Sequence, residues 1–460
     1  MIRLFKHYIP LPLIILSLVE IFILLLSVQG AIEIRFTTLE NSKIESITGI
    51  SSLFCFVIVV CLISMGLYQR HLRDGARGMF VRICVAFVIA FVAMSLLFYL
   101  FPSFFLGRGV LAIAFLISFL GVVLSRFIYI NVVDGESLNR RVLVLGVGQK
   151  AKLIDELLKR RSDRRGFVIV GYLALNEEIS VIDLNKTVPY DTSLIKLVEE
   201  LDVDEIVLAV NDRRDGFPVD ELLDCKMSGI DVVDVQSFFE RQAGRIILNL
   251  LQPSWLIFSD GFAQGAMRDI VKRIFDITVS LVLLVFALPI MLATAIIIYL
   301  EDRGPVFYQQ VRVGKNWKLV SVMKFRSMRT DAEKNGVQFA QKNDNRITKT
   351  GYFIRRTRID ELPQLINVLR GDMSFVGPRP ERPEFVEEFA ESIPFYSERH
   401  RVKPGITGWA QICYPYGDSE KDTVEKLQYD LYYVKNYSIF LDLTVIFQTA
   451  EVILWGKGAR

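Results

Sequence analysis

Long apolar runs constrain this chain more than any other feature of its sequence. In the first third, four of them occupy residues 8–29, 51–68, 79–100 and 109–130. Each is close to the ~20 residues that a helix needs to cross the ~30 Å hydrocarbon core of a bilayer. We therefore predict a multidomain, multi-pass membrane protein that begins with a four-helix transmembrane bundle in residues 1–135.

Basic residues in the connections between these runs predict the orientation. Arg3 and Lys6 precede the first run, and Arg70, Arg73 and Arg77 lie between the second and the third. The other two connections hold fewer basic residues. Because loops rich in Lys and Arg stay in the cytoplasm, we expect everything after the fourth run to be cytoplasmic.

Composition narrows the classes of function. The net charge is only +3 over 460 residues, so no global field favours nucleic acid as a partner. The 5 cysteines form no CxxC pair and no Cys/His cluster, and there are only 3 histidines. This pattern argues against a zinc site and against a disulfide framework.

From about residue 138 the pattern changes to alternating strands and helices. Short apolar strands are predicted at residues 141–145, 167–173, 205–210 and 231–235. Strands that alternate with helices indicate a parallel, doubly wound sheet. We predict a Rossmann-like α/β middle domain over residues 136–250.

A glycine-rich turn follows the first of these strands. Gly146, Gly148 and Ala151 fit the G-x-G-x-x-G/A pattern of dinucleotide sites. However, the second strand does not end in the acidic residue that usually holds the ribose. The chain also lacks the Tyr-x-x-x-Lys pair expected of short-chain sugar epimerases and dehydratases. We favour a structural or regulatory role for this domain, and nucleotide binding stays open.

A fifth apolar run, residues 274–300, differs from the first four. It contains Pro289 and has basic residues on both flanks, among them Lys272 and Arg303. Proline inside a helix costs about 3 kcal/mol and kinks it, and basic residues on both sides favour two cytoplasmic ends. We predict a re-entrant membrane helix over about residues 270–300. The alternative is a spanning helix with a proline kink, since membrane helices tolerate proline.

The remaining part of residues 251–460 is predicted to form a C-terminal α/β catalytic domain. Its first polar segment, residues 307–328, has the pattern of a hairpin with a turn at 314–316. The hairpin would bring Arg312, Lys324 and Arg326 into a small region. Alone, such charges usually form only a solvated face.

The second polar segment contains an Asp-Glu pair. Pro363 suits the first turn of a helix and Gly371 its end, so Asp360 and Glu361 are expected at or just before a helix N-terminus. Backbone N–H groups there favour anions, so Asp360 would stay ionised at neutral pH and act as a nucleophile without a base. Its neighbour could hold a hard cation such as Mg²⁺. A lone Asp-Glu pair is more often a plain helix cap.

Two further segments follow. In residues 371–383, Arg379 lies between two prolines that stiffen the backbone, which suits a guanidinium for bidentate phosphate binding. Residues 402–411 form a turn-rich loop that lets backbone approach a ligand closely. Taken singly, a linker is the better explanation of the first segment, and an ordinary surface turn explains the second equally well. Three arginines upstream of the acidic pair could neutralise a diphosphate: Arg355, Arg356 and Arg358.

Together these segments resemble the bacterial sugar transferase family, the monotopic phosphoglycosyl transferases (polyprenyl-phosphate sugar phosphotransferases). The resemblance covers about residues 272–443. Its motifs, in the family's order, are KRIFD (272–276), KFRSM (324–328), DELPQ (360–364), GPRP (377–380), PGITG (404–408) and YDLYY (429–433). The four spans and the α/β domain ahead of them are similar to the large subgroup of that family. Where small members often have Ser-Pro at the helix kink, this chain has Leu288-Pro289.

The resemblance implies a covalent mechanism on the cytoplasmic face of a bacterial inner membrane. Asp360 would attack the sugar-bearing phosphate of a UDP-sugar and form an Asp-phosphosugar intermediate, while Glu361 would hold Mg²⁺. Undecaprenyl phosphate would then accept the phosphosugar, which starts an exopolysaccharide or surface glycan. The residues expected to bind phosphates are Lys324, Arg326, Arg358, Arg379 and Arg312.

The expected partners are the UDP-sugar, undecaprenyl phosphate and the lipid bilayer, and a homo-oligomer stays open. The apolar stretch 437–455 is expected on the membrane interface or as a buried helix. Two other functions remain as alternatives. A membrane-bound nucleotide-sugar oxidoreductase or epimerase would use the turn at Gly146 and Gly148, and a non-catalytic scaffold for polysaccharide assembly would not need Asp360.

Overall fold

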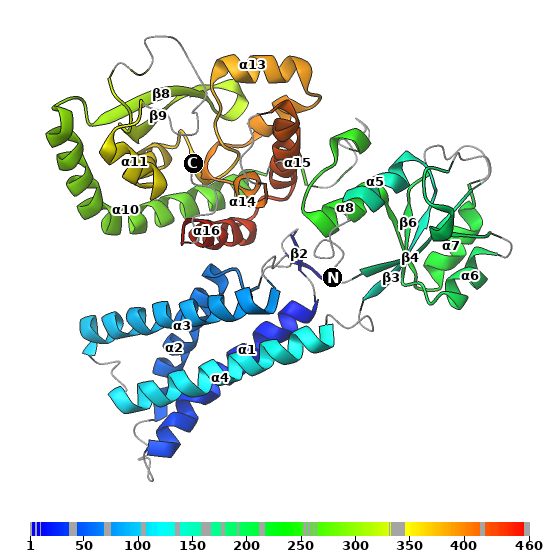
Figure 1. Ribbon diagram of the computed structural model, residues 1–460, viewed down its shortest axis with the longest axis horizontal. Helices are drawn as coiled ribbons and strands as arrows, with labels where there is room; N and C mark the ends of the chain where they lie inside the picture. The colour runs from blue at the N-terminus through cyan, green and yellow to red at the C-terminus, as the bar shows by residue number, and fades with distance from the viewer. Residues whose placement is uncertain are drawn as a thin grey trace. The chain divides into compact units, whose positions relative to one another are not determined.

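The computed structural model divides the chain into two compact units, which are described separately (Figure 1). The first unit extends to Ala243 and the second is Gly244–Arg460, apart from residues 5–7, which group with the second. The structure describes residues 2–4, 7–9, 11–35, 44–68, 75–102, 107–133, 139–157, 167–175, 180–190, 193–210, 217–251, 255, 259, 261–262, 265–330, 332, 346–414 and 419–454. Lys6, Arg70 and Arg73, which the orientation argument used, lie outside these residues, as does Trp455.

Four apolar helices form the N-terminal part, as predicted. They are α1 Leu11–Arg35, α2 Ile44–Ser64, α3 Gly75–Leu100 and α4 Arg108–Val133, preceded by β1 Ile2–Leu4 and β2 His7–Ile9. Helices α1, α3 and α4 are long and apolar enough to cross a membrane, and α2 contributes the shorter apolar stretch Thr48–Ser64. The first helix begins three residues later than the apolar run because residues 7–9 form β2.

Apolar side chains cover both the inner and the outer surfaces of these helices. Inside, the rings of Phe54 and Phe87 pack against Phe115, with centroid distances of 5.1 and 6.1 Å. Outside, Phe56 is 67% exposed. A helix that is apolar all round is stable in lipid and not in water. The N-terminal part is therefore that of a membrane protein.

One ion pair lies in the interior of the four helices. The guanidinium of Arg126 on α4 donates to both carboxylate oxygens of Glu20 on α1, at 2.6 and 2.9 Å. Both side chains are buried, at 1% and 0% exposure. Tyr68 donates its hydroxyl to Glu20, and its ring lies 4.6 Å from the Arg126 guanidinium. The pair thus joins α1, α4 and the end of α2.

A five-stranded parallel sheet follows in the first unit. Its order is β5-β4-β3-β6-β7, so the predicted parallel α/β domain is confirmed. Two strands are shorter than predicted, since β6 ends at Leu208 and β7 gives way to a helix at Val235. The two-residue strand β5 was too short to predict. The elements are β3 Arg140–Leu145, α5 Gln149–Leu157, β4 Phe167–Leu173, η5 Leu184–Lys186, β5 Thr187–Val188, α6 Leu194–Glu200, β6 Glu205–Leu208, α7 Val219–Met227, β7 Asp231–Asp234 and α8 Val235–Ala243.

The glycine-rich turn after β3 has a packing reason for its first glycine. Gly146 has a φ of +122°, and a Cβ there would lie 2.8 Å from the carbonyl carbon of Ala209, just after β6. Both conditions exclude residues with a side chain. Contact with the neighbouring strand therefore accounts for Gly146 without any ligand.

The second unit combines a long helix, a hairpin and a set of short elements. The predicted hairpin is confirmed, with strands β8 and β9 antiparallel, and β10 pairs with β11 in parallel. Residues 439–454 form a helix, as the apolar C-terminal stretch suggested. The elements are η6 Leu248–Leu250, α10 Ala266–Asp302, β8 Phe307–Val313, η7 Lys315–Trp317, β9 Leu319–Phe325, α11 Lys349–Arg356, η8 Ile359–Glu361, α12 Gln364–Arg370, β10 Ser374–Val376, α13 Pro383–Ser392, η9 Tyr396–Arg401, β11 Gly405–Thr407, α14 Trp409–Cys413, α15 Glu420–Asn436 and α16 Ile439–Leu454.

Helix α10 contains the fifth apolar run and Pro289. In Figure 1 it changes direction along its length, first following one side of the unit and then turning up another. Its buried residues recur at helical spacing and form one stripe: Asp276, Ser280, Ala287, Met291, Thr294 and Ile298. The opposite side exposes large apolar side chains, including Phe286 at 74% and Leu300 at 72%.

Both ends of α10 are tied to the same unit. Near its start, Asp276 accepts hydrogen bonds from the Ser374 hydroxyl and the Phe375 amide, each at 3.0 Å. At its end, Asp302 pairs with Arg326, and Glu301 accepts a 3.1 Å hydrogen bond from the amide of Lys349. The two arms of the helix therefore pack against one domain.

The buried ion pair between α1 and α4 predicts a specific pattern of stabilities. Glu20→Leu should lower the free energy of unfolding by about 3–5 kcal/mol, because it leaves Arg126 buried and unpaired. Glu20→Leu combined with Arg126→Leu should recover most of that loss, since no charge then remains in the interior. Thermal unfolding of the purified protein in detergent measures both. If the double variant were no more stable than the single one, an unpaired charge would not be the cause.

Candidate active site

The Asp-Glu pair lies on a short turn between two helices. Asp360 and Glu361 end the 3₁₀ turn η8, and α12 begins three residues later at Gln364. Arg358, just before the turn, has a left-handed backbone with φ +60°, and Gly371 ends α12 with φ +94°. The predicted helix after the pair is thus confirmed, with a sharp backbone turn ahead of it.

Asp360 is a buried carboxylate with one unsatisfied oxygen. The residue is 8% exposed, and its Oδ1 has no hydrogen-bond partner among the residues that the structure describes. Burial, and after it the charge of Glu361, raises the pKa of Asp360 to about 6 against the pull of Lys324, Arg358 and Arg355. The carboxyl is therefore mostly ionised at neutral pH, as the sequence predicts, although burial and not the helix N-terminus dominates its environment.

Glu361 has the opposite environment. Its Oε1 accepts from Lys324 Nζ at 3.1 Å and Arg379 Nη2 at 3.3 Å, and Arg358 Nη1 lies at 3.6 Å. Burial opposes the charge of Glu361, but Lys324, Arg379 and Arg358 outweigh it and hold the pKa well below its usual range. Neighbouring carboxyls with pKa values pushed apart are typical of sites where the two play different roles.

The cations reach Glu361 from three separate segments. Lys324 comes from β9, Arg358 from the turn before η8, and Arg379 from the loop after β10. A small cavity of about 20 Å³ lies among them, close to the space of one water molecule. Its lining residues are Arg312, Val322, Lys324, Glu361, Gln364, Arg379, Pro380, Gly405 and Ile406.

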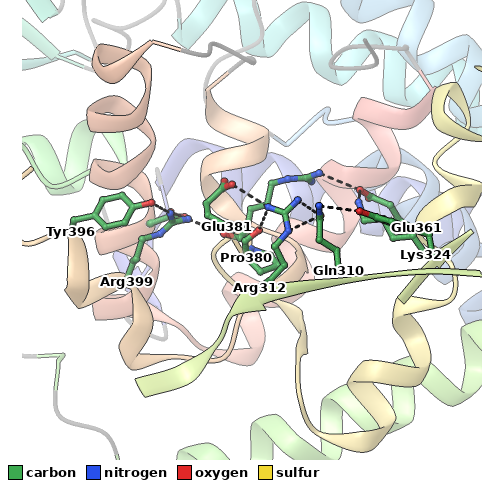
Figure 2. A network of polar contacts seen from close by, with 11 residues as sticks. Gln310, Arg312, Lys324, Glu361, Pro380, Glu381, Tyr396 and Arg399 are labelled. Carbon is green, nitrogen blue, oxygen red and sulfur yellow. Dashed lines mark hydrogen bonds and ion pairs between the residues drawn. The ribbon is translucent and has the colours of Figure 1, made fainter. Parts of the chain in front are cut away.

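Arg312 lines the cavity but is already engaged. Its Nε donates to the side-chain oxygen of Gln310 at 2.8 Å, and its Nη1 donates to the carbonyl of Pro380 at 3.2 Å. Glu381 lies 3.4 Å from the same nitrogen. Burial lowers the pKa of Arg312 to about 10. Figure 2 shows Arg312 and Glu381 between Glu361 and Lys324 on one side and Arg399 and Tyr396 on the other.

Other residues singled out from sequence have different contacts. Arg326 pairs with Asp302 at the end of α10. Arg355 is one of the cations that lower the pKa of Asp360, whereas Arg356 lies exposed on α11. Pro289 belongs to α10, and Gly146 and Gly148 belong to the other unit.

The turn that carries the pair rests on α10. Ile359 and Leu362, on either side of the pair, pack against a cluster that contains Ala287 and Met291. These two α10 residues lie on either side of Pro289. The position of the carboxyls therefore depends on the apolar helix beneath them.

The side chains of the site could supply only some of the ligands that a metal ion needs. In the described part of the chain, no three His, Cys, Asp or Glu residues lie close enough together to hold a metal by themselves. Mg²⁺ is usually held by one or two carboxylates together with substrate phosphates. Glu361 can supply such a carboxylate once a phosphate is bound.

The sequence alone indicated no role for three residues of this network: Gln310, Glu381 and Arg399. Glu381 and Arg399 flank motifs that sequence reasoning had singled out, GPRP and PGITG, so their proximity was the available signal. Gln310 lies two residues before Arg312 on β8, so the two side chains share one face of the strand, and this spacing was the available signal.

Two family models match different parts of the chain. Residues 267–456 match the family model "Bacterial sugar transferase", and residues 64–216 match "CoA-binding domain". The chain is 43% identical over 236 residues to a UDP-N-acetylgalactosamine-undecaprenyl-phosphate N-acetylgalactosaminephosphotransferase of Aeromonas hydrophila, covering 51% of the chain and 55% of the relative.

Glucose-1-phosphate transferases are similar as well. A UDP-glucose:undecaprenyl-phosphate glucose-1-phosphate transferase of Klebsiella pneumoniae is 34% identical over 67% of the chain and 58% of its own length. That of Xanthomonas campestris pv. campestris is 32% identical over 70% of the chain and 68% of its own length. The chain thus spans just over half the length of the first two relatives and two thirds of the third. With its motifs, its apolar helices and these matches, the chain belongs to the bacterial sugar transferase family.

Proposed function

We propose that the protein transfers a sugar 1-phosphate from a UDP-sugar to undecaprenyl phosphate and so initiates exopolysaccharide or surface-glycan synthesis. One observation carries this proposal: a buried carboxylate oxygen of Asp360, which has no hydrogen-bond partner among the described residues, lies beside a carboxylate held by three cations. The names of the relatives, which act on UDP-sugars and undecaprenyl phosphate, support it.

The proposed first step is a displacement at phosphorus. The unpaired Oδ1 of Asp360 attacks the phosphorus that bears the sugar, and the bond from this phosphorus to the bridging oxygen breaks. The electron pair leaves with UMP, and Asp360 becomes an acyl phosphate that carries the sugar. No proton has to be removed, because the attacking carboxylate is already ionised at neutral pH.

The second step regenerates the enzyme. A phosphate oxygen of undecaprenyl phosphate attacks the same phosphorus, and the bond to Asp360 breaks. In both steps Lys324, Arg358 and Arg379 stabilise charge on the phosphate oxygens. Mg²⁺ held by Glu361 would supply further neutralisation of the diphosphate. We assign no phosphate contact to Arg326, because its partner is Asp302.

We further propose that α10 is the re-entrant helix and that the catalytic unit lies on the cytoplasmic face of the inner membrane. Both ends of α10 are tied to one unit, and its outer side is apolar. A helix that crossed the bilayer would separate these two ends by the ~30 Å hydrocarbon core. For the parallel α/β domain we propose a structural or regulatory role, since packing explains Gly146.

The nucleophile can be tested by single turnover. With a panel of UDP-sugars and Mg²⁺ but no acceptor, the wild-type protein should release UMP and keep the labelled sugar phosphate bound covalently. Asp360→Asn should reduce release by roughly three orders of magnitude, because the attacking oxygen is gone. Glu384→Gln removes an exposed acid of the same unit and should behave as wild type. Normal UMP release by Asp360→Asn would rule out Asp360 as the nucleophile.

The pH dependence of UMP release should report the ionisation of Asp360. Because burial raises the pKa of this carboxyl to about 6, the reactive ionised form is lost at a higher pH than for an exposed aspartate. The single-turnover rate should fall about tenfold per pH unit below about pH 6 and level off above it. A profile that stayed flat down to about pH 4 would mean that a group with an ordinary pKa attacks.

The membrane path of α10 can be tested by labelling. In a background without the native cysteines, cysteines placed at Met267, at the start of α10, and at Lys349, on α11 after it, should react with a membrane-impermeant maleimide from the same side. Met267 is 72% exposed, and Lys349 is exposed as well, so burial in the protein does not block either. Labelling from opposite sides would show that α10 spans the bilayer, and would contradict a cytoplasmic catalytic unit.

A further inference from the structure

The segment that carries Arg379 is held almost entirely through its carbonyl groups. Pro378 and Pro380 have no N–H, so they cannot donate hydrogen bonds. The carbonyls of Pro378 and Glu381 accept from the amides of Gly405 and Val313, at 2.9 and 3.0 Å. The two carbonyls between them accept from side chains instead.

Those two side chains are arginines. Arg399 Nη2 donates to the Arg379 carbonyl at 3.0 Å, and Arg312 Nη1 donates to the Pro380 carbonyl at 3.2 Å. The Arg379 side chain itself extends to Glu361, 3.3 Å away. Arg399 thus contacts the backbone of the residue whose side chain reaches the carboxyl pair.

Arg399 is itself firmly held. Its Nη2 lies 2.8 Å from Asp430 Oδ2 on α15, and its Nη1 donates to the Tyr396 hydroxyl at 2.7 Å. The side chains of Arg399 and Asp430 are only 7% and 3% exposed. Figure 2 shows Arg399 and Tyr396 at the end of the network away from Glu361 and Lys324.

A buried ion pair of this kind is costly. Removing two charges from water costs several kcal/mol per ion, so replacing such a pair by apolar residues is often neutral or stabilising. Stability alone is therefore a weak reason for Arg399 and Asp430. The contact that an apolar pair could not make is the one to the Arg379 carbonyl.

We infer that Arg399, oriented by Asp430 and Tyr396, is a positioning residue that sets the direction of Arg379 toward the phosphates of the donor. The inference rests on the proposed function, in which Arg379 binds those phosphates. The proline after Arg379 already restricts its backbone to extended conformations. The hydrogen bond from Arg399 then selects one orientation of the intervening peptide, and with it one path for the guanidinium.

Arg312 has the same relation to the next peptide. Sequence reasoning expected it to bind phosphate, but all its nitrogens contact Gln310, Pro380 or Glu381. It holds the Pro380 carbonyl as Arg399 holds that of Arg379. The loop between β10 and α13 is thus supported by two guanidiniums on successive carbonyls.

A double-mutant cycle tests the inference. R399K keeps a positive charge beside Asp430 but loses the planar fork that reaches three acceptors. We expect R399K to raise the Kd for UDP and the KM for the UDP-sugar by about tenfold, the effect of losing one charge-assisted hydrogen bond. In an R379A background the same substitution should change neither value, because no side chain remains to be directed.

Two further proteins complete the design. R399M/D430L removes both buried charges and keeps the packing volume, so it should fold and show the same defect as R399K. R401Q, on the same turn η9, alters a 58% exposed arginine paired with Glu398 and should leave UDP binding unchanged. Thermal unfolding of each protein separates loss of fold from loss of binding.

The outcomes are distinct. A weakening of UDP binding by R399K that is equally large with and without R379A would overturn the inference and leave the proposed function intact. A wild-type protein that neither binds UDP nor releases UMP would overturn the proposed function and the inference together. A loss of UDP affinity caused by R399K only when Arg379 is present supports both the inference and the proposed function.

Discussion

The contrast between two neighbouring carboxyls organises the catalytic unit. Glu361 lies within 3.6 Å of three cations, whereas Oδ1 of Asp360, one residue away, is buried with no partner in the part of the chain that the structure describes. Adjacent acids would ordinarily share the same surroundings and repel each other's ionisation. The left-handed backbone of Arg358 and the 3₁₀ turn after it send the two side chains into different surroundings. A charge-stabilising group and a reactive group can therefore lie on consecutive residues.

This arrangement depends on the long apolar helix. Ile359 and Leu362 pack against the same cluster as Ala287 and Met291, on either side of Pro289. Burial is the main cause that raises the pKa of Asp360, and its two apolar neighbours on the turn pack against α10. A proline that weakens the helix is tolerated because the bent helix keeps both arms on the domain. The same contact links the position of the helix to the position of the carboxyls.

Sequence patterns predicted those parts of the structure that local periodicity determines. The four N-terminal helices, the parallel sheet, the hairpin and the helix after Pro363 each follow from the spacing of apolar, proline and glycine residues. The site residues Lys324, Arg358 and Arg379 were expected only from the family resemblance, since local patterns do not show that these separate segments meet at Glu361. Arg326 lies two residues from Lys324, yet its guanidinium pairs with Asp302 at the end of α10 and not with Glu361.

The sequence led us to expect that the N-terminus of α12 favours anions. In the structure, charged side chains contribute more to the electric field at the site than the backbone dipole of this helix. Helix α12 has only 7 residues, so few aligned peptides contribute to its dipole. Three full charges next to Glu361 are a stronger field than the half charge of a helix end. In the proposed reaction these cations also bind the phosphates of the donor. They can do so only if they keep their positions when a phosphate joins Glu361 as a second anion. Direct backbone anchors such as the one from Arg399 to the Arg379 carbonyl meet that need, because they hold the guanidinium independently of its contact with Glu361.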